Sequence, residues 1–379
     1  MLRHDALVIG GGPAGASAAI TLALRGHSVA MVEQRAPSAE KSHRSWLIDH
    51  GSFRDLQQLE VNVRGHEITS VRFSHHQNGI ERPLRDGAAF VITQDALFTA
   101  LRQRCRDVGV SVHEDTQATT PIIERGFLRG ALCSGDIEIH AEYSVIADGA
   151  NSTFGRTLGT YRRRDLPYLV AANGVWRSNL AATSTVNIAL DLTRANGNSL
   201  AGYGWLLPDG DNSMTAGVVV PSTVRDVESI NLRQVLDAMV STHSSRWGFD
   251  PDAPLELGRE RRLPVGGSVG PILGPTFVVA GDAGSTADPL SGIGVSGALL
   301  SGRLAGEVVS DAIDEGASAP LQKYSADLTS ALGQRRRIGR VMLPILGHKV
   351  GRVALPLAAH STAVADALLR STFDTSLRG

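Results

Sequence analysis

Three glycines near the start of the chain are spaced as in a loop that binds a nucleotide diphosphate. They lie in the stretch VIGGGPAGAS, residues 8–17, and an acid, Glu33, follows further along. Glycines at these places permit a tight turn, the approach of backbone N–H groups to the diphosphate, and close helix–strand packing. A carboxylate after the next strand accepts hydrogen bonds from a ribose. The pattern therefore predicts a nucleotide site made by Gly10, Gly12, Pro13, Ala14, Gly15 and Glu33.

The elements that must position these residues read strand, helix, strand. Residues 6–9 are apolar, Pro13 falls in the first helical turn, Gly26 ends the helix, and residues 28–32 resume an apolar run. A second match to the same glycine spacing, at 292–297, has no strand directly before it and no acid-terminated strand after it. We expect no second nucleotide site there.

Two further regions can be assigned from periodicity. Helical spacing of apolar residues predicts a helix over 93–108, and residues 276–284 read as a buried strand followed by a long helix with small residues on one side. Between 166 and 264 the pattern alternates, which favours a mostly antiparallel sheet with one helix near 227–241. The first lobe thus resumes late in the chain.

The composition is that of an ordinary globular protein. Among 379 residues, 42% are hydrophobic and 20% charged, and the net charge is -1. The composition is therefore not polybasic, and nucleic acid is not expected as a partner. Cys105 and Cys133 lie near no CxxC pair or histidine cluster, so neither a disulfide nor a metal site is expected. No leader pattern or spanning apolar stretch is present, and we expect a cytoplasmic protein.

Two later motifs carry a family resemblance. GDAGSTADPLSGIGVSGALLSGRLAGE, 281–307, and IADGANSTFGRTLG, 146–159, together with the first 33 residues, resemble the motifs of FAD-dependent oxidoreductases of the superfamily of aromatic hydroxylases (group A flavin monooxygenases), geranylgeranyl reductases and flavin-dependent halogenases. The resemblance implies FAD as the cofactor and an α/β fold in which a Rossmann-like FAD-binding domain is interleaved with a mostly antiparallel substrate domain. It places the FAD-binding domain at 1–75, 90–165 and 265–315, the substrate domain at 76–89 and 166–264, and a helical segment at 316–379.

The resemblance also implies roles for particular residues. Asp282 would bond the ribityl chain, and residues 289–294 would pass beside the isoalloxazine into a helix whose N-terminus stabilises negative charge on the reduced ring. Arg44 would reach the FAD phosphates or the ring edge. The cofactor-binding residues implied in this way are Arg44, Asp148, Gly281, Asp282, Gly292, Ile293 and Gly294. Gly155 stands where hydroxylases usually have arginine, so no nicotinamide site is assigned.

Candidates for the substrate pocket lie in the middle of the chain. The segment GYGWLLPDGDNSMTAGVVV, 202–220, resembles an aromatic-x-Trp-x-aliphatic-Pro segment of geranylgeranyl reductases and halogenases. Tyr203 and Trp205 either line a dry pocket, with Pro289 and Gly292, or pack the sheet. His43, Trp46 and Trp176 are expected to be structural.

Three reactions use this scaffold. We favour a monooxygenase that uses NAD(P)H and O2, through a flavin C4a-hydroperoxide, to hydroxylate its substrate. The expected substrate is electron-rich and largely apolar or aromatic, and is a small molecule or is borne by a carrier or a peptide. The reason is that the flavin itself is the reactive group, so no catalytic side chain is needed. The alternative is a C=C reductase of geranylgeranyl reductase type. A halogenase is less favoured, because Lys41 is the only lysine before residue 320 and lies too close to Glu33. The complete set of flavin motifs argues against a non-catalytic flavoprotein.

Residues 335–370 begin with basic residues and continue with apolar ones. We interpret them as a lid or a capping helix pair over the substrate domain. Peripheral membrane contact is the second interpretation, because Pro344, Gly347 and Pro356 interrupt any single amphipathic helix.

Overall fold

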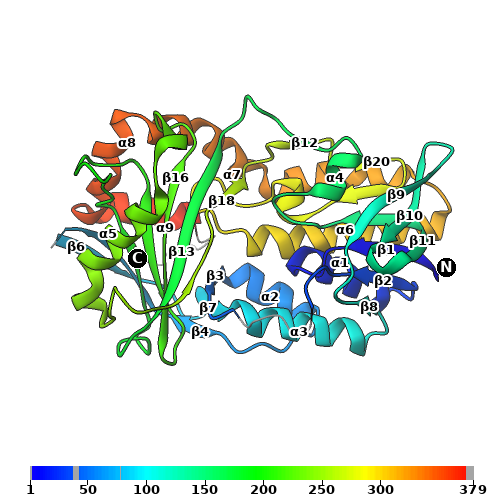
Figure 1. Cartoon of the computed structure of the whole chain (residues 1–379), viewed down its shortest axis with the longest axis horizontal. Helices are drawn as coiled ribbons and strands as arrows, with labels where there is room; N and C mark the ends of the chain where they lie inside the picture. The colour runs from blue at the N-terminus through cyan, green and yellow to red at the C-terminus, as the bar shows by residue number, and fades with distance from the viewer. Residues whose placement is uncertain (1, 37–41, 77, 373–379) are drawn as a thin grey trace.

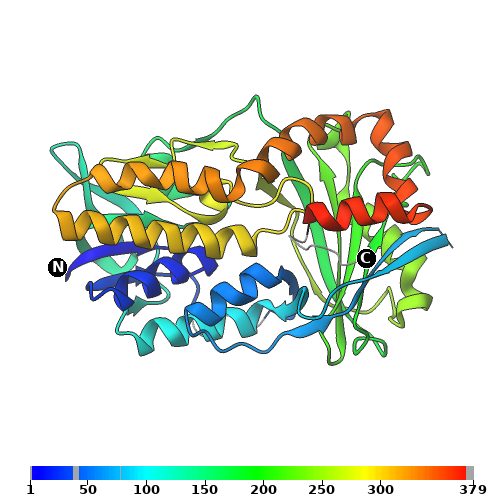
Figure 2. The same ribbon diagram turned by 180° about the vertical axis from the view of Figure 1, so that it is seen from behind.

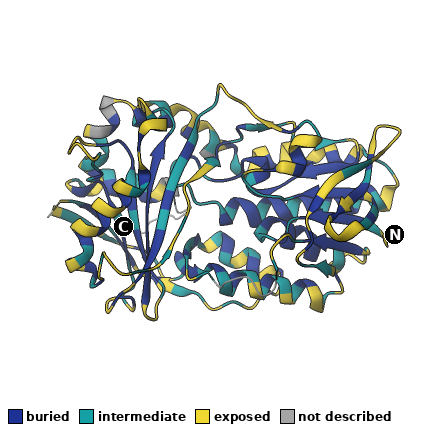
Figure 3. Cartoon of the chain, in the orientation of Figure 1, coloured by how far each residue is buried: buried dark blue, intermediate teal, exposed yellow. Residues whose placement is uncertain are grey.

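Two lobes lie side by side along the long axis of the molecule (Figure 1). The computed structural model describes residues 2–36, 42–76 and 78–372. We call the lobe that begins the chain the nucleotide lobe and the other the sheet lobe. Central strands and inner helices of both lobes are buried, as Figure 3 shows.

The nucleotide lobe is built on a sheet in which β21, β11, β1, β2 and β8 lie in that order and run parallel. The antiparallel β9 and β10 extend β11 on one side, and β20 pairs with β21. The strands are β1 (Leu2–Ile9), β2 (Val29–Val32), β8 (Ser111–His113), β9 (Ala118–Glu124), β10 (Phe127–Cys133), β11 (Ile137–Ile146), β20 (Leu273–Gly274) and β21 (Phe277–Val279). This confirms the predicted α/β fold class.

Helices cover one face of this sheet, and the late return of the chain is fixed by small residues on α6. A Cβ on Gly302 would lie 2.1 Å from the carbonyl oxygen of Ala14, and Ser17 Oγ donates to the carbonyl of Leu299 at 2.9 Å. α1 and α6 therefore pack backbone to backbone. The helices of this lobe are α1 (Pro13–Leu24), α2 (His50–Gln58), α3 (Gln94–Asp107), α4 (Thr153–Thr157), α6 (Val295–Glu315) and the 3-10 turns η1 (Ser134–Asp136) and η3 (Gly281–Gly284).

A small sheet and a short ribbon lie outside the main sheets. Strand β7 pairs with both β3 and β4, and β12 pairs with β19. Their bounds are β3 (Ser45–Asp49), β4 (His66–Ile68), β7 (Ala89–Thr93), β12 (Tyr161–Arg162) and β19 (Val269–Gly270).

The sheet lobe has the strand order β17-β13-β16-β15-β14-β5-β6, with β18 also paired to β13. Its elements are β5 (Ser70–His75), β6 (Asn78–Pro83), β13 (Tyr168–Arg177), β14 (Thr185–Ala189), β15 (Tyr203–Pro208), β16 (Ser213–Pro221), β17 (Pro254–Leu257), β18 (Arg261–Pro264), η2 (Val227–Ser229) and α5 (Leu232–Trp247). The expected domain boundary placed residues up to 75 in the FAD-binding domain, but β5 pairs with β14 in the sheet lobe. This pairing joins segments that are distant in sequence, so no local pattern indicates it. The helix expected near 227–241 begins later, at Leu232, because Asn231 caps it by accepting from the N–H of Gln234.

The C-terminal segment begins against α6 of the nucleotide lobe, crosses the junction between the lobes and ends over the sheet lobe. It consists of η4 (Ala319–Gln322), α7 (Lys323–Gly347), α8 (Lys349–Ala354), η5 (Leu355–Ala359) and α9 (Thr362–Thr372), seen from orange to red in Figure 2. Pro344 lies inside α7, one turn before the helix ends. Among the described residues, no helix is both long and apolar enough to cross a membrane.

Candidate functional site

The glycine loop between β1 and α1 has the geometry of a diphosphate site. Gly10 has a φ of +106°, and a Cβ there would lie 2.2 Å from the carbonyl oxygen of Ala147, so only glycine fits. A Cβ on Gly15 would lie 1.8 Å from the carbonyl of Gly10. A Cβ on Gly12, in contrast, would meet no described atom within 4 Å. The N-terminus of α1 therefore faces open space, with free N–H groups that attract an anion.

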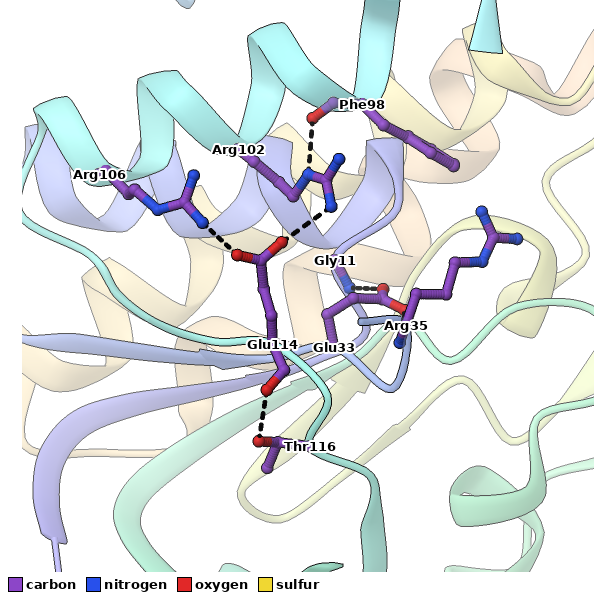
Figure 4. A network of polar contacts seen from close by, with 8 residues as sticks. All are labelled: Gly11, Glu33, Arg35, Phe98, Arg102, Arg106, Glu114 and Thr116. Carbon is purple, nitrogen blue, oxygen red and sulfur yellow. Dashed lines mark hydrogen bonds and ion pairs between the residues drawn. The ribbon is translucent and has the colours of Figure 1, made fainter. Parts of the chain in front are cut away.

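Glu33 lies beside this loop, held by two backbone N–H groups (Figure 4). Gly11 donates to one carboxylate oxygen at 2.8 Å, and Arg35 donates to the other at 2.9 Å. Each oxygen keeps a free lone pair, since a carboxylate offers about four acceptor sites. The carboxylate is thus oriented and still able to accept hydrogen bonds from ribose hydroxyls.

Asp148 follows β11, and residues of the loop after it donate hydrogen bonds to its carboxylate. Its carboxylate accepts from the Ser152 hydroxyl at 2.7 Å and from the N–H of Phe154 at 2.8 Å, at the start of α4. These hydrogen bonds hold the end of β11, and Gly10 packs against this strand end at Ala147. Direct contact of Asp148 with the cofactor stays a prediction.

Asp282 and the start of α6 lie together. Gly281 and Asp282 form η3, and a Cβ on Gly294 would lie 3.2 Å from Asp282 Oδ1. Within the described part of the chain, no hydrogen bond reaches the Asp282 carboxylate. Burial raises the pKa of Asp282, and the charge of Arg261 opposes that shift. An unpaired, mostly buried carboxylate is the group that a ribityl hydroxyl would satisfy.

The loop from Ala287 to Gly294, which we call the ring loop, is held in shape by Asp288. The Asp288 side chain accepts from the N–H groups of Leu290 and Ser291 at 2.9 and 2.7 Å. Gly292 has a φ of +64°. Pro289 packs against α7, where a Cβ on Gly339 would lie 1.9 Å from the proline ring. Ile293 and Gly294 then lead into α6, whose positive dipole end is not capped by a side chain.

Tyr203 and Trp205 lie on β15, at the side of the sheet lobe that contacts the ring loop. The Tyr203 hydroxyl donates to the carbonyl of Ser291. The two rings lie 6.3 Å apart and pack on a buried apolar cluster. That cluster, which we call the junction cluster, is Leu169, Val219, Val265, Ala287 and Leu343. Trp205 also covers Gly217, where a Cβ would lie 2.1 Å from the indole. Tyr203 therefore contacts the ring loop, and Trp205 has a large packing component.

Arg44 is paired with a carboxylate of the sheet lobe. Its Nε lies 2.7 Å from Glu256 Oε1 and donates to Ser42 Oγ at 3.0 Å. Glu256 also accepts from the N–H of His43 at 2.8 Å. The structure thus shows a cross-lobe ion pair at Arg44, and its expected phosphate contact stays a prediction.

Arg261 was not identified from the sequence. Burial together with the charges of Arg44 and Arg35 lowers the pKa of Arg261, while Asp282 and Glu256 oppose the shift. Arg261 therefore lies within electrostatic reach of Arg44, Arg35 and Asp282. The segment RERRLP, residues 259–264, could have indicated Arg261, because side chains alternate between the two faces of a strand. Arg262 lies over the ring of Tyr168, so Arg261 points to the other face of β18.

The weaker candidates have structural contacts. Trp176 is buried in the sheet lobe and donates from Nε1 to the carbonyl of Pro251 at 3.2 Å, and Trp46 packs edge-on against Phe98. Cys105 and Cys133 are buried free thiols, and burial raises the pKa of Cys105 to about 12. Lys41 lies outside the described residues.

Comparisons with known proteins identify an FAD binding domain and several related reductases. Residues 3–190 match a family described as FAD binding domain. A menaquinone reductase of Mycolicibacterium smegmatis is 29% identical over 321 residues, covering 81% of this chain and 76% of that protein. A digeranylgeranylglycerophospholipid reductase of Methanoculleus marisnigri is 27% identical over 340 residues, covering 86% of this chain and 81% of that protein.

Solved structures share the fold. A geranylgeranyl bacteriochlorophyll reductase-like protein of Thermoplasma acidophilum superposes with a TM-score of 0.79 at 20% identity, over 98% of this chain and 97% of that one. A flavin-dependent brominase superposes with a TM-score of 0.71 at 18% identity, over 97% and 93%.

FAD fits the residues present. The open N-terminus of α1, the oriented Glu33 and the unpaired Asp282 offer partners for its diphosphate, ribose and ribityl chain in turn. The chain is therefore an FAD-dependent oxidoreductase with an FAD binding domain at residues 3–190, and it is similar to reductases named for menaquinone and for digeranylgeranylglycerophospholipid.

Proposed function

We propose that this enzyme reduces carbon–carbon double bonds in the isoprenoid chain of a lipid. The observation that carries the proposal is its similarity, over about four-fifths of the chain, to two reductases named for menaquinone and for digeranylgeranylglycerophospholipid. Both compounds carry isoprenoid chains. The junction cluster agrees with it, because the buried surroundings of the ring loop are aliphatic on this side.

In this reaction the alkene gains a hydride on one carbon and, on the other, a proton that comes ultimately from solvent. When bound, reduced FAD supplies the hydride and is left oxidised. The first turn of α6 places free N–H groups where they stabilise negative charge, and the junction cluster excludes water from the ring loop. Burial raises the pKa of Tyr203, so its hydroxyl stays protonated and keeps its hydrogen bond to Ser291.

Monooxygenation, which the sequence favours, also suits a dry apolar pocket. The two reactions differ in their need for oxygen: a reductase acts without O2, and a monooxygenase transfers one of its atoms to the substrate. NAD(P)H is the electron donor that we predict in either case.

Anaerobic reoxidation of the flavin tests the proposal. The FAD-loaded protein is reduced with dithionite and mixed, without oxygen, with digeranylgeranylglycerophospholipid in detergent micelles. We expect the oxidised flavin spectrum to return as the lipid is consumed. A flavin that stays reduced until oxygen is admitted would contradict the reductase. Menaquinone is unsuitable as this probe, because its quinone ring accepts electrons itself.

A further inference from the structure

The C-terminal helices leave an apolar face uncovered. Ile338, Val341 and Ile345 on α7, Val353 on α8 and Leu357 on η5 are all exposed; together we call them the outer face. Val353 and Val341, at 71% and 64% exposure, are the most exposed of the large apolar side chains among the described residues. Scattered single apolar residues are normal on a surface, but a group of this size on consecutive helices marks an interaction site.

The face cannot be buried by rotating α7. Ile338, Val341 and Ile345 are spaced three and four residues apart and form one stripe along the helix. The opposite side already holds Gly339 against Pro289 and Leu343 in the junction cluster. Thr223 Oγ1 also donates to the carbonyl of Leu343 at 2.8 Å. The helix is therefore apolar on two sides, and residues of the described chain cover only one of them.

The segment that carries the outer face is rich in basic residues. The segment 323–372 contains eight basic and two acidic residues, in a chain whose net charge is -1. One of the acids, Asp366, is neutralised by a two-point ion pair with Arg82, at 2.6 and 3.0 Å. The basic residues are Lys323, Arg335, Arg336, Arg337, Arg340, Lys349, Arg352 and Arg370. The segment is thus strongly positive, while the rest of the chain is negative.

We propose that the outer face docks this enzyme on an anionic lipid bilayer. Exposed apolar side chains on a segment of net positive charge match an interface in which hydrocarbon lies beneath negative headgroups. A second copy of the chain is a poorer partner, because pairing this face with itself would bring two positive segments together.

If the enzyme acts on an isoprenoid lipid, as proposed above, docking would bring it to the membrane that holds this substrate. The inner side of α7 contributes Leu343 to the junction cluster, and a helix is only about 10 Å across. A bilayer in contact with the outer side would therefore lie close to the apolar wall beside the ring loop.

Co-sedimentation of the full-length, FAD-loaded protein with vesicles tests docking without any turnover, so its failure is distinguishable from failure of the proposed function. The vesicles are phosphatidylcholine alone, or phosphatidylcholine with phosphatidylglycerol. We expect binding that requires phosphatidylglycerol and weakens with salt. The double variant V341D/V353D should lose about ten-fold or more in binding, since two exposed apolar anchors are replaced by charges.

A matched double variant, I123D/L132D, alters two exposed apolar residues of the nucleotide lobe and should bind like the unaltered protein. The flavin spectrum reports that each variant is folded. Absence of vesicle binding by the unaltered protein, or equal losses in both variants, would overturn the proposal. It would also be overturned if V341D/V353D kept its vesicle binding but converted a dimer into a monomer in light scattering.

Discussion

The hydroxyl of Tyr203 donates a hydrogen bond to the carbonyl of Ser291, and this bond joins the sheet lobe to the ring loop. Asp288 shapes the same loop from within, and Pro289 fixes it against α7. The position of the ring loop therefore depends on both lobes and on the C-terminal helices, rather than on the nucleotide lobe alone.

Replacing Tyr203 by phenylalanine removes only that hydroxyl. We expect Y203F to unfold with a free energy about 1 kcal/mol lower than the unaltered protein, because the Ser291 carbonyl loses its partner. Urea unfolding of the FAD-loaded protein measures the difference. Y168F is the matched control, since within the described chain the Tyr168 ring contacts the guanidinium groups of Arg162 and Arg262 and its hydroxyl makes no hydrogen bond. Equal stability of Y203F and Y168F would show that the bond is unimportant.

Glu33 and Glu114 lie near each other in Figure 4 but are predicted to have different roles. Glu114 is paired with Arg102 at 2.8 Å and with Arg106, whereas the Glu33 carboxylate accepts, among the described residues, only from the backbone N–H groups of Gly11 and Arg35. We expect E33Q to weaken FAD binding about ten-fold or more, the loss of roughly 1.5–3 kcal/mol for hydrogen bonds to a charged group. E114Q should leave the Kd for FAD unchanged. Fluorescence titration of the apoprotein measures both, and similar Kd values for the two variants would refute the assignment.

Arg261 and Arg262 are adjacent on β18 and point to opposite sides of the strand. Arg261 is surrounded by the charges of Arg44, Arg35 and Asp282, while Arg262 lies 3.5 Å from the exposed Glu228. We expect R261M to raise the Kd for FAD about ten-fold and to reduce its salt dependence, because one cation near the diphosphate is lost. R262M should bind FAD normally. The prediction fails if R262M weakens binding as much as R261M.

Asp282 makes the folded apoprotein sensitive to pH. Burial raises its pKa above the unfolded value, so the folded state binds more protons over that interval. Its contribution favours folding when the carboxyl is protonated and is lost as the pH rises through the folded pKa. We therefore expect apo D282N to be more stable than the unaltered apoprotein at neutral pH, with a difference that shrinks in acid.

Thermal unfolding across the acid-to-neutral range measures this difference, and FAD titration should show that D282N binds the cofactor more weakly. D288N provides a contrast of opposite sign, because the Asp288 carboxylate accepts three hydrogen bonds within the ring loop. If apo D282N is less stable than the unaltered apoprotein at neutral pH, the claim that the Asp282 carboxylate is unpaired would be contradicted.

Sequence reasoning succeeded where the signal is local. The βαβ unit, the helix over 93–108 and the late return through α6 follow from turn glycines, caps and small-residue spacing, and the helix is observed as Gln94–Asp107 with Thr93 as its cap. The confirmed fold class rests on these elements and on the resemblance.

The remaining features depend on contacts between distant segments. The pairing of β5 with β14, the ion pair of Arg44 with Glu256, and the approach of Arg261 to Asp282 each join residues that no local pattern relates. The choice between reduction and hydroxylation is harder still, because the flavin supplies the reactivity in both and the protein supplies mainly an apolar wall.

The mass of the product formed without oxygen tests the central claim most directly. The FAD-loaded, dithionite-reduced enzyme is incubated anaerobically with an isoprenoid lipid, and the lipid is analysed by mass spectrometry with fragmentation of its chain. We predict the gain of two hydrogen atoms for each reduced bond, located in the isoprenoid chain. An unchanged lipid under these conditions, with a product that carries an added oxygen atom only when O2 and reductant are both present, would contradict it.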